Sequence, residues 1–166
     1  MQNEFKKKSI RGGVIADLLF PLETIRDNTT TIINEVQGFG VKDTDNRLLL
    51  MKFRVSAYNI FFNYVEYLFK TKKFQNKKFR NKTFKGSKIV KLMSLLRLRI
   101  DECEFHEKFF GEYNTNISDL YAEQKKAFQE IWDFLQKYLV ENFDEACDFF
   151  DSFLGNIFNE EENINE

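Results

Sequence analysis

Residues 95–113 read LLRLRIDECEFHEKFFGEY, and this stretch decides the fold that we expect. Apolar residues recur in it and in the preceding turns at the spacing of one helix face, while charged residues recur on the opposite face. The pattern predicts a long amphipathic helix that buries one side. Its apolar face holds Ile89, Leu92, Met93, Leu96, Ile100 and Cys103, and its charged face holds Arg97, Asp101, Glu104 and Lys108.

The same helix carries the only histidine of the chain, His106, seven residues after Arg99. Seven residues make about two helical turns, so both side chains lie on one side of the helix, with Glu102 one turn from each. Leu95 and Leu98 extend the apolar surface past this polar strip. We therefore expect Arg99, Glu102 and His106 to form a half-buried candidate catalytic site, where a substrate or a second subunit docks.

The chain has 166 residues, 43% of them hydrophobic, with a single proline and seven glycines. This length suffices for one domain with a core of its own. Because helix-breaking residues are few, long helices are favoured over a turn-rich β fold. We predict an all-α domain, a four- to five-helix bundle with one long basic loop. Residues 1–13 are expected to form a basic flexible leader, 14–158 the single helical domain and 159–166 an acidic tail.

Spacing and capping signals predict where the helices lie. We expect helices over residues 14–37, 45–69, 88–110, 119–139 and 143–158. Ser87 is the expected N-cap of the third helix, and Ser118 or Asn116 that of the fourth. No internal repeat is recognised, and no segment shows the alternation of a β-strand. The connections are therefore expected to be short, apart from the basic loop.

Charge is distributed unevenly along the chain. The net charge is −1, which argues against a protein that coats nucleic acid through its global charge. Nine of the 25 basic residues nevertheless lie between Lys70 and Lys88, and residues 141–166 hold nine acidic residues and no basic one. We expect a molecule with one basic and one acidic region.

Within residues 70–88, phenylalanines recur at every fifth position, which fits neither a helix face nor a strand face. We interpret the segment as a loop. Interleaved cations and aromatic rings suit single-stranded RNA, because the cations follow the phosphates while the rings stack on bases. The alternative is a solvated connector that its phenylalanines anchor to the bundle. The candidate nucleic-acid-binding residues are Lys72, Lys73, Phe74, Lys77, Lys78, Phe79, Arg80, Lys82, Phe84 and Lys85.

Other chemistries find little support in the sequence. Cys103 and Cys147 do not define a disulfide framework, and we expect both to be reduced. Cys103 and His106 form only a two-ligand fragment, so neither a metal site nor a cofactor is expected. The N-terminus lacks a signal-peptide pattern and no apolar run reaches the length of a membrane span, so we expect a cytoplasmic protein without a membrane partner.

Three elements follow one another along the chain. They are a long aromatic helix with SAYNIFFNY at residues 56–64, a helix in which six residues separate Arg99 from His106, and Asn-Ile-Ser before another amphipathic helix. This order resembles the HEPN superfamily of helical-bundle ribonucleases and toxins. The resemblance covers residues 48–139. The specific motif of this family is an arginine followed by a histidine after four to six residues. The family usually has a polar residue directly after the arginine, where this chain has Ile100.

The resemblance implies a homodimer that cuts RNA without metal, as toxins of phage defence do. An imidazole such as His106 can take a proton from a ribose hydroxyl or return one to the leaving oxygen. The Arg99 guanidinium can hold the phosphate and stabilise its developing charge. Glu102 can orient the imidazole ring or raise its pKa.

Two alternatives from other classes stay open. The protein can be a non-catalytic helical interaction protein, a phage- or plasmid-encoded inhibitor or adaptor, whose acidic residues 141–166 imitate nucleic acid. It can also be a HEPN-like bundle without activity that serves as an adaptor or antitoxin, with His106 simply favourable near a helix C-terminus. RNA and another protein are thus both candidate partners, and a homodimer is the expected assembly.

Overall fold

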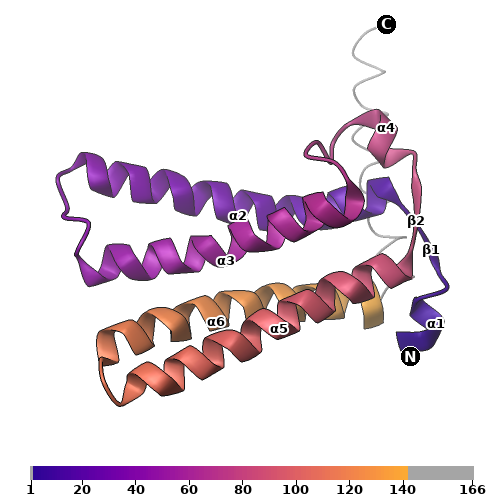
Figure 1. Ribbon diagram of the computed structural model, residues 1–166. Coiled ribbons are helices and arrows are strands. Elements are labelled where there is room, and N and C mark those ends of the chain that lie inside the picture. Colours follow the sequence, from indigo (N-terminus) through magenta and orange to yellow (C-terminus); the bar gives the residue numbers. More distant parts are fainter. Residues whose placement is uncertain (1, 142–166) are drawn as a thin grey trace, which may run out of the picture.

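The structure is a computed structural model that describes residues 2–141. Two long helical hairpins lie one above the other, and a short antiparallel ribbon joins them at one end (Figure 1). This arrangement confirms the expected all-α bundle. The elements are α1 (Gln2–Phe5), β1 (Ser9–Arg11), α2 (Gly12–Gly38), α3 (Asn46–Phe69), α4 (Lys77–Arg80), β2 (Thr83–Lys85), α5 (Gly86–Gly111), α6 (Thr115–Leu135) and the π-helical turn η1 (Gln136–Glu141). The predicted last helix at 143–158 and the acidic tail lie outside the described residues.

The helix ends follow from local chemistry. Asp45 caps α3 by accepting a hydrogen bond from the Arg47 amide at 2.9 Å, and Asn114 caps α6 through two amides. The helix α3 ends at Phe69, and its C-cap Lys70 takes a left-handed conformation with φ 54°. The predicted N-cap Ser87 is wrong, because α5 begins at Gly86 without a side-chain cap.

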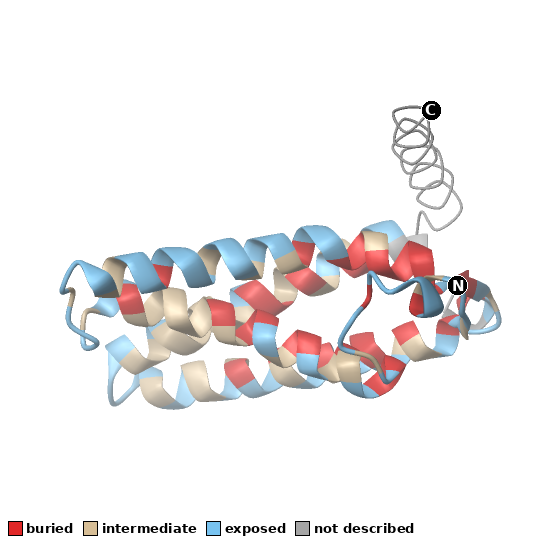
Figure 2. Cartoon of the chain, turned by 90° about the horizontal axis from the view of Figure 1, so that it is seen from above, coloured by how far each residue is buried: buried red, intermediate tan, exposed pale blue. Residues whose placement is uncertain are grey.

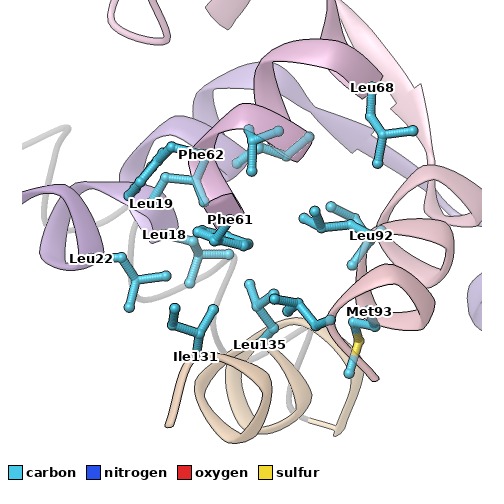
Figure 3. Packing of buried hydrophobic residues seen from close by; sticks show 14 of the residues in the cluster. Leu18, Leu19, Leu22, Phe61, Phe62, Leu68, Leu92, Met93, Ile131 and Leu135 are labelled. Atoms are coloured by element: carbon cyan, nitrogen blue, oxygen red, sulfur yellow. The ribbon is translucent and has the colours of Figure 1, made fainter. Parts of the chain in front are cut away.

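The core lies between the two hairpins. Inward-facing side chains of all four long helices meet there, and the outer helix surfaces are exposed (Figure 2). Phe61 of α3 sits near the centre, with Leu18 and Leu22 of α2 and Ile131 and Leu135 of α6 below it and Leu92 of α5 across from it (Figure 3). The α5 face predicted from the sequence is buried as expected, and it comprises Ile89, Leu92, Met93, Leu96, Ile100 and Cys103.

The N-terminal segment is not the flexible leader that we predicted. It forms α1 and β1, and Phe5 and Ile10 belong to the core with 3% and 1% of their surface exposed. The backbone of this segment also completes α5, because Lys8 O accepts from the Gly86 amide at 2.8 Å and Lys6 O from the Ser87 amide at 3.2 Å. These two bonds satisfy helix N-terminal amides that a side-chain cap would otherwise satisfy.

The basic segment 70–88 is likewise more ordered than a loop. It contains α4 and β2, and β2 pairs with β1 in antiparallel register. Phe74 and Phe79 are buried, and Phe84 packs against the core with part of its surface exposed. The Phe79 ring meets the rings of Phe69 and Phe74 edge to face, with centroids 6.2 and 5.5 Å apart. The five-residue spacing of the phenylalanines thus reflects a turn of helix followed by a strand.

The order of elements repeats: a short helix, a strand and two long helices occur twice. The sequence repeats with it, contrary to our expectation of no internal repeat. Shifting the first copy by 74 residues places Phe5 on Phe79 and Gly12 on Gly86. The same shift matches Lys8 with Lys82, Ser9 with Thr83, Arg11 with Lys85, Ile15 with Ile89, Leu18 with Leu92 and Leu22 with Leu96.

The second long helices also correspond, with a shift of 70 residues. Ala57 then matches Ala127, and both are fully buried. The shift is four residues smaller because residues 39–45 connect α2 to α3, whereas only 112–114 connect α5 to α6. The further matched pairs are Tyr58 with Phe128, Phe61 with Ile131, Phe62 with Trp132, Tyr64 with Phe134 and Val65 with Leu135.

The hydrogen bonds around the ribbon repeat as well. The Gly12 amide donates to Lys82 O at 2.7 Å, just as the Gly86 amide donates to Lys8 O at 2.8 Å. Each of these glycines also packs against a backbone carbonyl of the other copy, Phe79 O for Gly12 and Phe5 O for Gly86. A pseudo-twofold axis through the ribbon therefore relates the two halves of the described chain (Figure 1).

Candidate functional site

The ribbon end of the bundle gathers side chains from both halves. The central pair, Ile10 and Phe84, faces the core, and the flanking residues of both strands point outward. In an antiparallel pair the residues on one face alternate with those on the other, so the outer face holds two cross-strand pairs. These pairs are Ser9 with Lys85 and Arg11 with Thr83, and all four residues are exposed.

Further cations surround this outer face. The first half contributes Lys6 and Lys7, and the second half contributes Lys77, Lys78 and Lys82, all of them exposed. No acidic residue occurs in the sequence at positions 5–16 or 67–100. Glu4 of α1 is the acidic residue nearest to them in sequence, so cations outnumber carboxylates here and set the sign of the local field. We call this surface the basic end. It comprises Lys6, Lys7, Ser9, Arg11, Lys77, Lys78, Lys82, Thr83 and Lys85.

Two of the cations in segment 70–88 have structural partners. Arg80 pairs with Asp17 of α2, with Nη1 2.8 Å from Oδ1, and both side chains are largely buried. Lys88 donates to Leu68 O at 3.1 Å and lies over the Phe84 ring. Arg80, which we predicted to bind nucleic acid, instead joins α4 to α2.

The other predicted nucleic-acid-binding residues divide into two groups. Burial of Phe74 and Phe79 leaves no free ring face for a base, which favours the anchoring alternative for these aromatic side chains. The lysines of the prediction remain at the surface. They are Lys72, Lys73, Lys77, Lys78, Lys82 and Lys85.

The polar strip on α5 is held together by contacts among its members. Glu102 lies between the other two, with Oε2 3.3 Å from Arg99 Nη1 and Oε1 3.8 Å from His106 Nε2. Arg99 Nε also donates to Tyr64 Oη of α3 at 2.6 Å. This hydrogen bond, opposed by partial burial, raises the pKa of Arg99 above its ordinary value.

The imidazole of His106 packs in an aromatic stack. Its ring lies 4.7 Å from that of Tyr121 on α6, and Phe110 stacks on the same tyrosine at 5.8 Å. A third of the His106 side-chain surface is exposed, at 33%. Both Arg99 and His106 are thus half-buried, as predicted, and each contacts a tyrosine of a neighbouring helix.

Sequence reasoning did not assign roles to these two tyrosines. Tyr64 lies in the aromatic stretch 56–64, but helical spacing alone does not show which residue of another helix it meets. Tyr121 carries no sequence signal, since its position opposite His106 depends on the short connection between α5 and α6.

The basic end and the polar strip lie far apart in one chain. His106 follows Gly86 by 20 residues within α5, which corresponds to about 30 Å along the helix axis. The ribbon joins the opposite end of this helix (Figure 1). The two groups of candidate residues therefore form two separate surfaces.

Cys103 is a buried residue of the core side of α5. Its thiol lies 3.2 Å from Gln124 Oε1, and burial raises its pKa to about 11. A thiol with this pKa stays protonated at neutral pH, which disfavours metal binding. Within residues 2–141, no three His, Cys, Asp or Glu side chains gather as metal ligands would.

None of the helices between residues 2 and 141 combines the length and apolar character needed to cross a membrane. Comparison with protein-family models, with curated proteins and with solved structures finds no match for this chain. The resemblance to the HEPN superfamily stays a prediction.

Proposed function

We propose that this chain is a nucleic-acid-binding protein whose contact surface is the basic end. One observation carries the proposal: residues from both halves, far apart in sequence, place exposed cations around the outer face of a single ribbon. The ribbon backbone is fixed by its pairing and by the buried Ile10 beneath it. The backbone that carries Arg11 and Lys85 consequently needs little ordering to meet a ligand.

Phosphate is the chemical group that this surface suits. Lysine and arginine side chains that neutralise phosphates release condensed counterions, and this release drives binding without regard to sequence. A net charge near zero does not oppose this, because local charge sets the field that a ligand meets.

The test is fluorescence anisotropy with labelled 20-nucleotide RNA, the matching single-stranded DNA and the matching duplex, at several salt concentrations. Replacing Lys77, Lys78 and Lys82 by Glu is expected to weaken binding at least ~10-fold, because each replacement removes a phosphate contact. The salt dependence of binding should fall as well, since fewer counterions are released. The matched control replaces Lys42, Lys108 and Lys126 by Glu, which makes the same charge change away from the ribbon.

The control triple variant is expected to bind within about twofold of the wild type, since charges farther than a Debye length are screened. Equal weakening by both triple variants would show that overall charge, not the basic end, governs binding. Absence of binding to all three nucleic acids in low salt would reject the proposal.

A second candidate function, metal-independent RNA cleavage, is favoured by the contacts of Glu102. This carboxylate touches both Arg99 and His106, so a cation, an acid–base group and an orienting carboxylate are held side by side. In this proposal His106 transfers the proton, Arg99 binds the scissile phosphate and Glu102 positions both. Two chains act together, as the resemblance implies.

The cleavage test uses a mixed RNA substrate in EDTA and compares the wild type with His106→Ala and Glu102→Gln. Loss of the proton-transfer group is expected to lower the rate by about 10²–10⁴-fold. Lys108→Ala, on the same helix, is the control and is expected to cut normally. If His106→Ala cuts as fast as the wild type, the strip is not catalytic, whereas the binding proposal is unaffected.

A further inference from the structure

The two-stranded ribbon has dimensions that fit the major groove of duplex DNA. It consists of three residues from each strand, and the described chain places no third strand beside it. Paired strands lie about 4.8 Å apart, so two strands with their side chains fit a major groove about 12 Å wide. The ribbon stands at the end of the bundle, where the long helices do not flank its outer face (Figure 1).

The outward side chains carry the groups that recognise base edges. Arginine and lysine donate to guanine O6 and N7, while hydroxyl side chains donate to or accept from either base type. The outer face offers Arg11 and Lys85 as cations and Ser9 and Thr83 as hydroxyls, all exposed. The inward neighbours, Ile10 and Phe84, anchor these strands to the core.

The pseudo-twofold axis adds a symmetry argument. The 74-residue shift places Ser9 on Thr83 and Arg11 on Lys85, so each strand presents one hydroxyl and one cation in the same order. Duplex DNA has local twofold axes of its own, and a symmetric reader matches an inverted repeat. Because one strand has Arg11 where the other has Lys85, the matched half-sites differ.

The flanking lysines complete this geometry. Lys6 and Lys7 follow α1 beside one end of the ribbon, and Lys77 and Lys78 belong to α4 beside the other (Figure 1). The helices α1 and α4 are themselves related by the pseudo-twofold axis. Cations therefore lie beyond both ends of the ribbon, where the phosphate backbones continue along the groove.

We propose that the β1–β2 ribbon enters the major groove of B-form DNA and reads a short, imperfect inverted repeat, with Arg11 and Lys85 contacting bases and the flanking lysines contacting phosphates. The inference rests on the proposed nucleic-acid-binding function and names its ligand. Duplex RNA fits less well, because the major groove of an A-form helix is too narrow for side chains to read.

The experiment selects binders from a pool of 24-base-pair DNA duplexes with ten random central positions, using the full chain. We expect enrichment of an inverted repeat. The affinity ratio between the enriched duplex and a scrambled duplex is then measured for three proteins: the wild type, Arg11→Gln/Lys85→Gln, and Lys77→Gln/Lys78→Gln. Thermal melting checks that both variants fold.

The two variants are expected to fail differently. The ribbon-face variant should lose at least ~10-fold of the affinity ratio, since each base contact contributes about tenfold discrimination. The flanking variant should weaken both duplexes equally and reduce the salt slope by about two charges. Replacing guanine by 7-deazaguanine in the enriched duplex removes N7 from the major groove and should act like the ribbon-face variant.

Other outcomes would overturn the inference. No enriched sequence, or an unchanged ratio for the ribbon-face variant, would show that the ribbon does not read bases. Tighter binding of single-stranded or duplex RNA than of any DNA duplex would assign the surface to RNA. Both results leave the proposed binding function intact, whereas that function fails if no nucleic acid binds or if both triple variants weaken binding equally.

Discussion

Ile10 lies directly opposite Phe84 at the centre of the β1–β2 ribbon, and both side chains face the core. The two residues correspond to each other under the 74-residue shift, so this pair marks the pseudo-twofold axis. The short helix, the strand and the two long helices on one side of the pair have counterparts on the other, as do the glycine amides that bond across the ribbon. The pair thus fixes which residues point into the bundle and which point out.

The matched glycines at the helix starts should tolerate no side chain. A Cβ atom at Gly12 would overlap Phe79 O, and one at Gly86 would overlap Phe5 O. We expect Gly12→Ala and Gly86→Ala each to lower the free energy of unfolding by roughly 1–3 kcal/mol, measured by urea denaturation. Gly13→Ala is the control, because its Cβ would lie 3.5 Å from Arg80 O, an ordinary contact. Equal stability of all three variants would contradict the tight packing described above.

The buried phenylalanine of α4 should matter for stability. Phe79→Ala removes a core ring that packs on Phe69 and Phe74, and we expect a loss of about 3–5 kcal/mol. Phe105→Ala, at a position that is 66% exposed, should change stability by less than about 0.5 kcal/mol. A stable Phe79→Ala protein with impaired RNA binding would instead support the base-stacking hypothesis.

Lys70 ends α3 in a left-handed conformation, which costs a residue with a Cβ atom about 1 kcal/mol relative to glycine. Lys70→Gly should therefore raise the melting temperature. Lys72→Gly provides the comparison, since Lys70 is the one non-glycine residue with positive φ in the described chain. That second variant should be neutral or slightly destabilising. The reverse order of the two melting temperatures would count against the assigned backbone conformation.

The bond between Arg99 and Tyr64 links α5 to α3. Tyr64→Phe keeps the ring and removes the acceptor of the 2.6 Å bond, so we expect a loss of roughly 1 kcal/mol. Tyr67→Phe, one turn further along α3 and exposed, should be silent. If the strip cleaves RNA, Tyr64→Phe should also slow cleavage, because Arg99 loses the contact that holds it.

The raised pKa of Cys103 predicts low reactivity. An increase from 9.0 to about 11 lowers the thiolate fraction at pH 8 about 100-fold, and burial further limits access. Iodoacetamide at pH 8, followed by peptide mass spectrometry, should label Cys103 far more slowly in the native protein than in urea. Since the unfolded thiol ionises first as pH rises, stability should fall above about pH 9. Rapid native labelling would show that Cys103 is accessible.

The sequence predicted the helices of the bundle well. Apolar spacing placed the buried face of α5 from Ile89 to Cys103, because one helix face determines what is buried whatever its neighbours are. It also brought Arg99, Glu102 and His106 together, since residues three and four apart on a helix are neighbours. Contacts within one helix are thus readable from spacing.

The ribbon was not predicted, and the reason is physical. Strands of three residues, such as Ser9–Arg11, are too short to show alternation, and their stability comes from pairing with a partner more than 70 residues away. The repeat was hidden because its two shifts differ by four residues and many matched positions conserve only size or charge. Tyr64 and Tyr121 were missed because their contacts cross between helices.

The connection through residues 70–76 makes the two halves one molecule. If each strand–helix–helix half were a separate subunit, the ribbon would open on dilution below the dissociation constant. Covalent linkage instead holds the second strand at an effective concentration of about millimolar or higher, so ribbon assembly is unimolecular. The sequence of each half can therefore change independently of the other. The matched positions that hold Arg11 in the first half and Lys85 in the second are one such difference.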